Sequence, residues 1–226
     1  DERTLVNLLV EQIEFADVVV LNKITSADEQ KLDAARKIIR SLNADAEIFE
    51  VNHSEVPIDA ILNTGLFDFE KAHEHPMWAK ELYGFADHVP ETEEYGVSSY
   101  VYRARRPFEP EKIMNVLNGD LSGVIRAKGH FWIATRPDWV AEYSLAGALS
   151  SVKPLGTWWA SVPEARWPKD DIGKQYMKQN WEEPWGDRRQ EIVFIGSDIN
   201  WGDIKSKLDD ALVSEAISSL SDPLPT

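Results

Sequence analysis

The sequence predicts a two-part chain, in which a partial doubly wound α/β segment is followed by an α+β domain. Up to about residue 62, stretches with helical spacing of apolar residues alternate with short branched apolar runs, as in parallel α/β folds. Residues 73–95 then lose all periodicity, and strand patterns dominate after them. We therefore expect a first unit at residues 1–72, a linker at 73–95 and a second unit at 96–226.

The first unit is expected to alternate helices with strands. In order, we predict a helix at 5–15, a strand at 18–21, a helix at 26–42, a strand at 46–51 and a short helix at 57–62. Ser26 and Glu29 have the spacing of a capping box for the second helix. The run Val18–Leu21 has the composition of a strand buried on both faces. One helix between two strands is too little to complete a doubly wound sheet, so we expect an unpaired sheet edge here.

The second unit has an α+β pattern of the split βαβ type. We predict strands at 97–105, 124–127, 130–134, 142–149 and 192–195, helices at 110–117 and 203–213, and a helical insertion near 163–185.

Composition limits the functional classes. The formal charge of −15 argues against nucleic-acid binding, which needs an excess of Lys and Arg. No apolar run approaches the roughly 20 residues that span a bilayer, and residues 1–3 do not resemble a secretory signal. The absence of cysteine excludes disulfides and thiolate metal sites. We expect a cytoplasmic protein with neither a nucleic-acid nor a membrane partner.

The stretch VVVLNKIT at residues 18–25 ends an apolar run in Asn22-Lys23. In GTPases, a loop after a buried strand commonly carries Asn-Lys-x-Asp, and its Asp accepts hydrogen bonds from the N1–H and the 2-amine of guanine. Ligands of open α/β sheets bind at the carboxyl ends of strands, which is where this dipeptide falls. The residues alone leave two interpretations open: a strand that ends in polar residues, or part of a guanine-recognition loop.

Longer blocks resemble a known family. These are FADVVVLNK, VPIDAILNTGLFDFEKA, PETEEYGVSSYVYRARRPFEPEKI, GVIRAKGHFWIATRP, LGTWWA and WGDRRQEIVFIGSDI. Together they resemble CobW-like GTPases, and within them the branch proposed to act as zinc metallochaperones. The resemblance implies the end of a P-loop GTPase-like domain at residues 1–72 and a CobW C-terminal domain at 96–226. It also implies GTP and Mg²⁺ as cofactors, zinc as cargo and a client metalloprotein as partner, with Asn22, Lys23 and Thr25 on the nucleotide base.

The chain also departs from the family pattern. The phosphate-binding motif G-x-x-x-x-G-K followed by Ser or Thr does not occur, nor do the acidic Mg²⁺ motif and the Cys-x-Cys-Cys metal motif. Thr25 stands where the pattern has Asp, and Asp28 would replace that Asp only in a remodelled loop. We therefore expect no catalytic residues and no GTP hydrolysis by this chain alone. Whether it is a fragment or the product of a shortened gene stays open.

His73 and His75, with His88 nearby, are candidate zinc ligands, although a His-x-His pair is also common on solvated linkers. The basic run at 103–106 and the tryptophans likewise admit either a binding role or a structural one.

Two functions compete at this stage. One is a portion of a GTP-dependent zinc chaperone, and the other is a non-catalytic module that docks a client protein. The expected unpaired sheet edge would either fray or pair with a second copy of the chain.

Overall fold

The computed structural model describes residues 5–68 and 97–214. The expected linker and the candidate ligands His73, His75 and His88 lie outside the described residues. In the first unit the elements are α1 (Leu5–Glu14), β1 (Val18–Asn22), α2 (Glu29–Leu42) and β2 (Glu47–Val51), with 3-10 turns at Ile24–Ser26 and Ile58–Ala60.

The first unit is built on a parallel strand–helix–strand motif. Within the described residues, β1 and β2 pair only with each other, in a register that runs from Val18 opposite Glu47 to Asn22 opposite Val51. A parallel pair needs a crossover, and α2 supplies it. β1 is not buried on both faces, since Val20 is 38% exposed. The description of this unit as an incomplete doubly wound domain stays a prediction.

Two local expectations in the first unit were wrong. α2 is capped by Asp28, whose carboxylate accepts from the Lys31 amide at 2.9 Å, and not by a Ser26–Glu29 box. Ser26 is instead taken up in the 3-10 turn, where its amide bonds to the Lys23 carbonyl. The helix expected at 57–62 is only the 3-10 turn Ile58–Ala60, with Pro57 preceding it.

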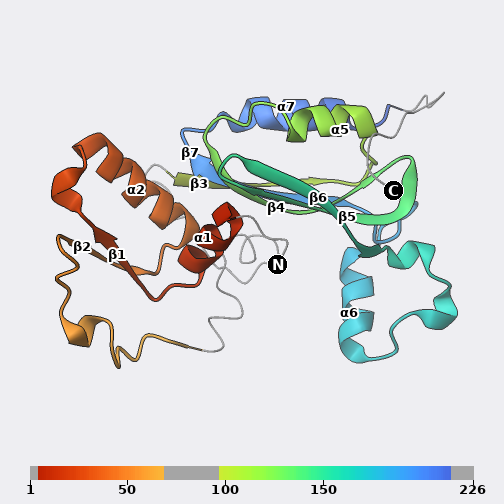
Figure 1. The fold of residues 1–226 in the computed structure, drawn as a ribbon. Helices are drawn as coiled ribbons and strands as arrows, with labels where there is room; N and C mark the ends of the chain where they lie inside the picture. The colour runs from red at the N-terminus through yellow and green to blue at the C-terminus, as the bar shows by residue number, and fades with distance from the viewer. Residues whose placement is uncertain (1–4, 69–96, 215–226) are drawn as a thin grey trace.

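The second unit is a sheet with two helices on one face. Its elements are β3 (Val97–Ala104), α5 (Pro110–Leu117), β4 (Val124–Ile133), β5 (Arg136–Ala146), β6 (Leu149–Thr157), α6 (Asp171–Asn180), β7 (Gln190–Ser197) and α7 (Trp201–Ala211). The antiparallel five-stranded sheet has the order β3-β7-β4-β5-β6. Figure 1 shows α5 and α7 side by side on one face of it. The whole chain is therefore a mixed α/β structure.

The split βαβ arrangement that the sequence predicts is present, because β7 inserts between β3 and β4. β7 is buried along nearly its whole length, as expected of a central strand. The core lies between the sheet and the two helices and includes Phe131, Phe194 and Leu208, all fully buried. The two short strands expected at 124–127 and 130–134 form one strand, and β6 was not expected.

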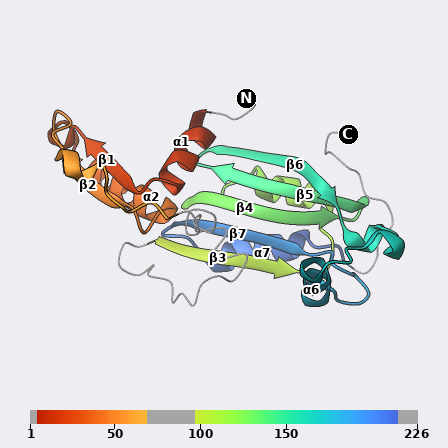
Figure 2. The same cartoon turned by 90° about the horizontal axis from the view of Figure 1, so that it is seen from below.

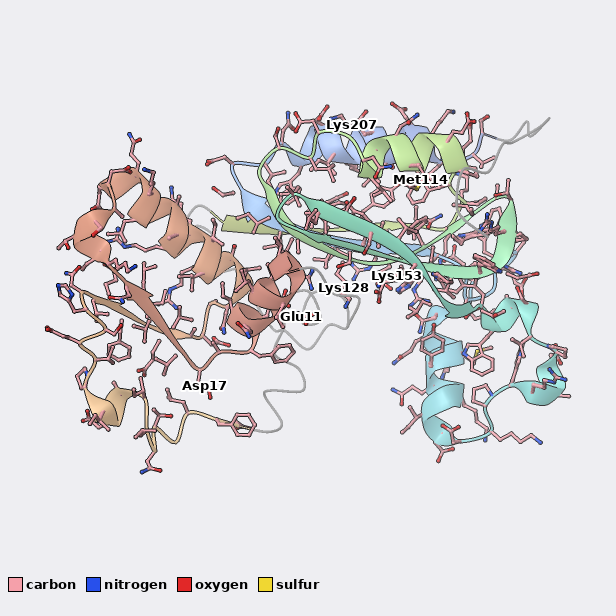
Figure 3. The ribbon with its side chains drawn as sticks, in the orientation of Figure 1. Glu11, Asp17, Met114, Lys128, Lys153 and Lys207 are labelled. Atoms are coloured by element: carbon pink, nitrogen blue, oxygen red, sulfur yellow. The ribbon has the colours of Figure 1, made fainter. Side chains whose placement is uncertain are left out.

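The two units contact each other on the face of the sheet that is opposite α5 and α7. Val10 of α1 and Leu42 of α2 pack with Ala146 of β5. Figures 1 and 2 show the first unit at one end of the sheet and α6 at the other. In Figure 3, Lys128 and Lys153 project from the sheet on this same side, between the two ends.

Candidate functional site

The candidate site consists of two loops at the carboxyl ends of β1 and β2. Residues 23–25 follow β1, and residues 52–54 follow β2. Because the two strands are parallel and in register, their carboxyl ends lie at the same edge and the two loops meet. Crevices at this edge are where open α/β sheets bind ligands.

Asn22 joins the two loops through its side-chain amide. Its Oδ1 accepts from the backbone N–H of Lys23 at 2.8 Å and from that of Ser54 at 3.0 Å. Its Nδ2 donates to Ser54 Oγ at 2.9 Å. A single side chain therefore holds the first residue after β1 and the third residue after β2 in fixed positions.

Asn52 makes the reciprocal connection from the second loop. Its Oδ1 accepts from the Thr25 amide at 3.1 Å and from the Thr25 hydroxyl at 2.8 Å. Sequence reasoning placed Asn22, Lys23 and Thr25 at this site but missed Asn52 and Ser54. The signal was the polar stretch Asn52-His53-Ser54, directly after a predicted strand. The structure thus brings Asn22 and Thr25 together through partners on β2's loop.

The backbone of both loops is held in left-handed conformations. Lys23 has φ 64° and ψ 35°, His53 has φ 54° and Ser54 has φ 58°. Each such residue other than glycine costs about 1–2 kcal/mol, so the side-chain bonds of Asn22 help to maintain a costly geometry. Strained backbone of this kind tends to cluster at functional sites.

The charges near the site are not those of a guanine-reading loop with an acceptor carboxylate. Asp28 is occupied as the cap of α2, and its Oδ2 also pairs with Lys31 Nζ at 2.8 Å. The side-chain and backbone bonds from Lys31 lower the pKa of Asp28. The Lys23 side chain is exposed at the loop surface. The site offers an exposed cation beside two loops that are joined by side-chain hydrogen bonds.

No metal centre appears in residues 5–68 and 97–214, where no group of three or more His, Asp or Glu side chains is placed to hold an ion. The same stretches contain no helix long and apolar enough to cross a membrane.

The arginines and tryptophans that sequence reasoning left open have structural partners. Arg105 Nη1 donates to the Asn180 carbonyl at 2.9 Å, and Arg188 Nε donates to the Pro137 carbonyl at 2.7 Å. Trp132 packs against Trp185, with ring centroids 5.7 Å apart and ring planes tilted by 60°. These contacts attach the segment that carries α6 to the end of the sheet.

Comparison with protein families covers both units. Residues 97–212 match the family described as the cobalamin synthesis protein cobW C-terminal domain. Residues 1–50 match the CobW/HypB/UreG nucleotide-binding domain. The chain belongs to the CobW family.

Named CobW relatives cover almost the whole chain. A zinc-regulated GTPase metalloprotein activator from Dictyostelium discoideum is 44% identical over 220 residues, which are 96% of this chain and 46% of that protein. A zinc chaperone from Mycobacterium tuberculosis is 26% identical over 95% of this chain and 51% of its own length. The chain therefore spans about half the length of these relatives.

Among solved structures, the Zn(II)-bound YjiA GTPase from E. coli is similar with a TM-score of 0.42 and 19% identity. That comparison covers 89% of this chain and 54% of the other. A TM-score at this level does not support a fold assignment.

Proposed function

We propose that the chain is a portion of a GTP-dependent zinc chaperone, to which it contributes the base-side loops of the nucleotide site and the CobW C-terminal domain. The names of the relatives support assignment to the zinc chaperones. The two loops that Asn22 and Asn52 join support a role in binding the nucleotide base. The C-terminal domain, which we place at residues 96–226, would act on a client metalloprotein. The nucleotide-domain part would extend to residue 72, and the protein would act in the cytoplasm.

The observation that carries the proposal is the side-chain amide of Asn22. It fixes Lys23 in a left-handed conformation at the carboxyl end of a parallel strand, and it holds the neighbouring loop through Ser54. An exposed Lys stem positioned in this way can lie along a nucleoside. A strand that merely ends in polar residues would not need two loops tied together by costly backbone geometry.

The described residues do not fit the phosphates or Mg²⁺. They include neither the glycine-rich phosphate motif nor a cluster of acidic metal ligands. Phosphoryl transfer depends on positioning and neutralising the phosphates, so the chain by itself should bind GTP weakly and not hydrolyse it. We propose that the phosphate-holding residues belong to polypeptide outside these 226 residues.

Titration with a fluorescent GTP analogue tests the proposal. We expect binding that is weak, competed by unlabelled GTP and lost in Asn22→Ala, but retained in the control Asn115→Ala on α5. GTP hydrolysis that persists through repeated purification and in Lys23→Ala would contradict the proposal that the phosphate-binding residues lie outside this chain. Complete absence of binding would favour the second candidate, a non-catalytic module that docks a client. The missing phosphate motif is the observation that favours that candidate.

For the metal, we propose that zinc is cargo and that His73, His75 and His88 give at most weak binding. Imidazole is a good zinc ligand, but two or three histidines without a fixed further ligand make a poor site. Calorimetry should give an affinity that is micromolar or poorer and that disappears in His73→Ala/His75→Ala. Unchanged binding in that double variant would place the metal elsewhere.

A further inference from the structure

We propose that the side chain at position 25 decides base selectivity at this site, and that Thr25, which is bonded to Asn52 and offers no pair of acceptors, leaves the site without selectivity for guanine. The inference rests on the proposed function, because it assumes that these loops receive a nucleotide base. It goes beyond that function in assigning a specificity to Thr25 and a positioning role to Asn52.

Guanine differs from the other purines at the edge that carries N1 and the 2-amino group. That edge offers two neighbouring donors, whereas hypoxanthine offers only the N1–H and adenine has an acceptor at N1. Reading the pair requires two acceptors in one plane, which a carboxylate provides and a hydroxyl does not. A site built to bond both donors would reject analogues that lack one of them.

Thr25 cannot supply such a pair of acceptors. Its one side-chain proton is donated to Asn52 Oδ1 at 2.8 Å, and its backbone N–H is bound by the same oxygen at 3.1 Å. The residue is therefore tied toward the β2 loop at two points. Its hydroxyl oxygen retains at most one contact with a base, so it cannot accept from N1–H and the 2-amino group together, as a carboxylate does.

The neighbouring acidic residues with assigned partners do not replace the missing carboxylate. Asp28 accepts from Lys31 as the cap of α2, and Glu29 pairs with Arg36 at 2.8 Å. Turning Asp28 toward a base would remove the cap of α2. Glu55 is a further exposed acidic residue, which directly follows the second loop, and the experiment includes it.

Asn52 is the positioning residue in this arrangement. With Thr25 beside it, the amide presents its oxygen to the first loop. A carboxylate at position 25 would repel that oxygen, and a turn of the Asn52 amide would present its NH₂ group instead. Thr25→Asp should therefore be accommodated in the existing loops, with Asn52 supporting the new carboxylate.

The test is an NMR titration of the ¹⁵N-labelled chain with GMP, IMP and AMP. In the wild type we expect shifts at the amides of Asn22, Lys23 and Asn52, with dissociation constants for the three nucleotides within about threefold of one another. Thr25→Asp should tighten GMP over IMP by about tenfold, since a second hydrogen bond is recovered. Thr25→Val removes the hydroxyl but keeps the shape. It should leave the ratios of the dissociation constants for GMP, IMP and AMP as they are in the wild type. The backbone spectrum of each variant reports whether it is folded.

A wild type that prefers GMP over AMP by about tenfold or more would overturn the inference and leave the proposed function intact. If Glu55→Gln abolished that preference, guanine would be read by Glu55 and not through position 25. If a folded Thr25→Asp variant keeps the wild-type ratios of these dissociation constants, the role of Thr25 is equally overturned. The absence of shifts with any nucleotide, in both the wild type and Thr25→Asp, would overturn the proposed function together with the inference.

Discussion

His130 is held neutral on the face of the sheet that is opposite α5 and α7. Burial and the nearby Arg189 guanidinium lower its pKa from 6.5 to about 4, although Glu191 acts in the opposite direction. Glu191 Oε2 lies 3.6 Å from His130 Nε2, too far for a hydrogen bond, and Glu142 stands opposite His130 on β5. Below pH 6.5 the unfolded chain binds a proton here that the folded chain does not. Stability should therefore fall as the pH drops toward 4.

We predict that His130 alone lowers the free energy of unfolding by about 2 kcal/mol between pH 7 and pH 5. Urea unfolding at the two pH values measures it. His130→Phe should remove this part of the pH dependence, because it removes the titrating group. His53→Asn, at an exposed loop position with positive φ, should keep it. An identical pH dependence in the wild type and His130→Phe would show that His130 titrates normally in the folded chain.

At the level of single residues, the sequence predicts only part of the candidate site. Asn22, Lys23 and Thr25 stand out because they follow a strongly apolar strand. Asn52 becomes important only through the register of β1 and β2, which brings it beside Thr25. That register arises from the packing of α2 and both strands, and no local pattern reveals it.

Among the elements, α1 is attached to the sheet by an ion pair that is almost fully buried. Arg126 Nε on β4 lies 2.8 Å from Glu14 Oε1, and the two side chains are 4% and 3% exposed. Arg126 also donates to the Ser144 hydroxyl at 3.2 Å and to the Leu145 carbonyl at 3.3 Å. Burial raises the pKa of Glu14, and the attraction of Arg126 opposes that rise. The pair fixes the position of α1 against β4 and β5.

We predict that removing one partner of this pair is far more destabilising than removing both. Glu14→Leu leaves a buried guanidinium uncompensated and should cost about 3–5 kcal/mol, whereas Glu14→Leu/Arg126→Met should recover most of that loss. The exposed pair of Lys37 with Asp33 serves as the control, and Lys37→Met should change stability by less than about 1 kcal/mol. Urea denaturation of the four proteins measures each effect. Equal losses in the single and the double variant would mean that packing, and not the uncompensated charge, dominates.

Elements with strong local signals appear where the sequence predicts them. α5 has its expected bounds because Pro110 suits the first turn of a helix and Ile113 and Leu117 form one buried stripe. β6 escapes prediction because an edge strand needs no alternation of buried side chains, and Lys153 and Pro154 are typical of such edges. The pieces expected at 124–127 and 130–134 are one strand because Gly129 lies within the sheet. A Cβ there would come within 2.2 Å of the Glu191 carbonyl oxygen, so glycine permits the close approach of β4 and β7.

In the whole molecule, the first unit is docked on the second. Val10, Leu42 and Ala146 form an apolar cluster across the boundary, and the pair of Glu14 with Arg126 lies in the same seam. This docking stabilises α1 and α2 more than β1 and β2. The two strands pair only with each other among the described residues, and β1 contains the exposed Val20.

We therefore predict that the first unit opens more readily than the second, with β1 as its weakest part. Hydrogen exchange in dilute protein should give weaker protection at residues 18–21 than at 192–195, because Ile192–Ile195 are at most 1% exposed and lie in the central strand. Raising the protein concentration should increase protection at residues 18–21 alone if the unpaired edge of the small sheet binds a second copy. Sedimentation at both concentrations separates self-association from a change within the monomer. Equal protection of the two strands in a verified monomer would mean that the parallel pair is stable without further strands, and that its interpretation as part of a larger sheet is wrong.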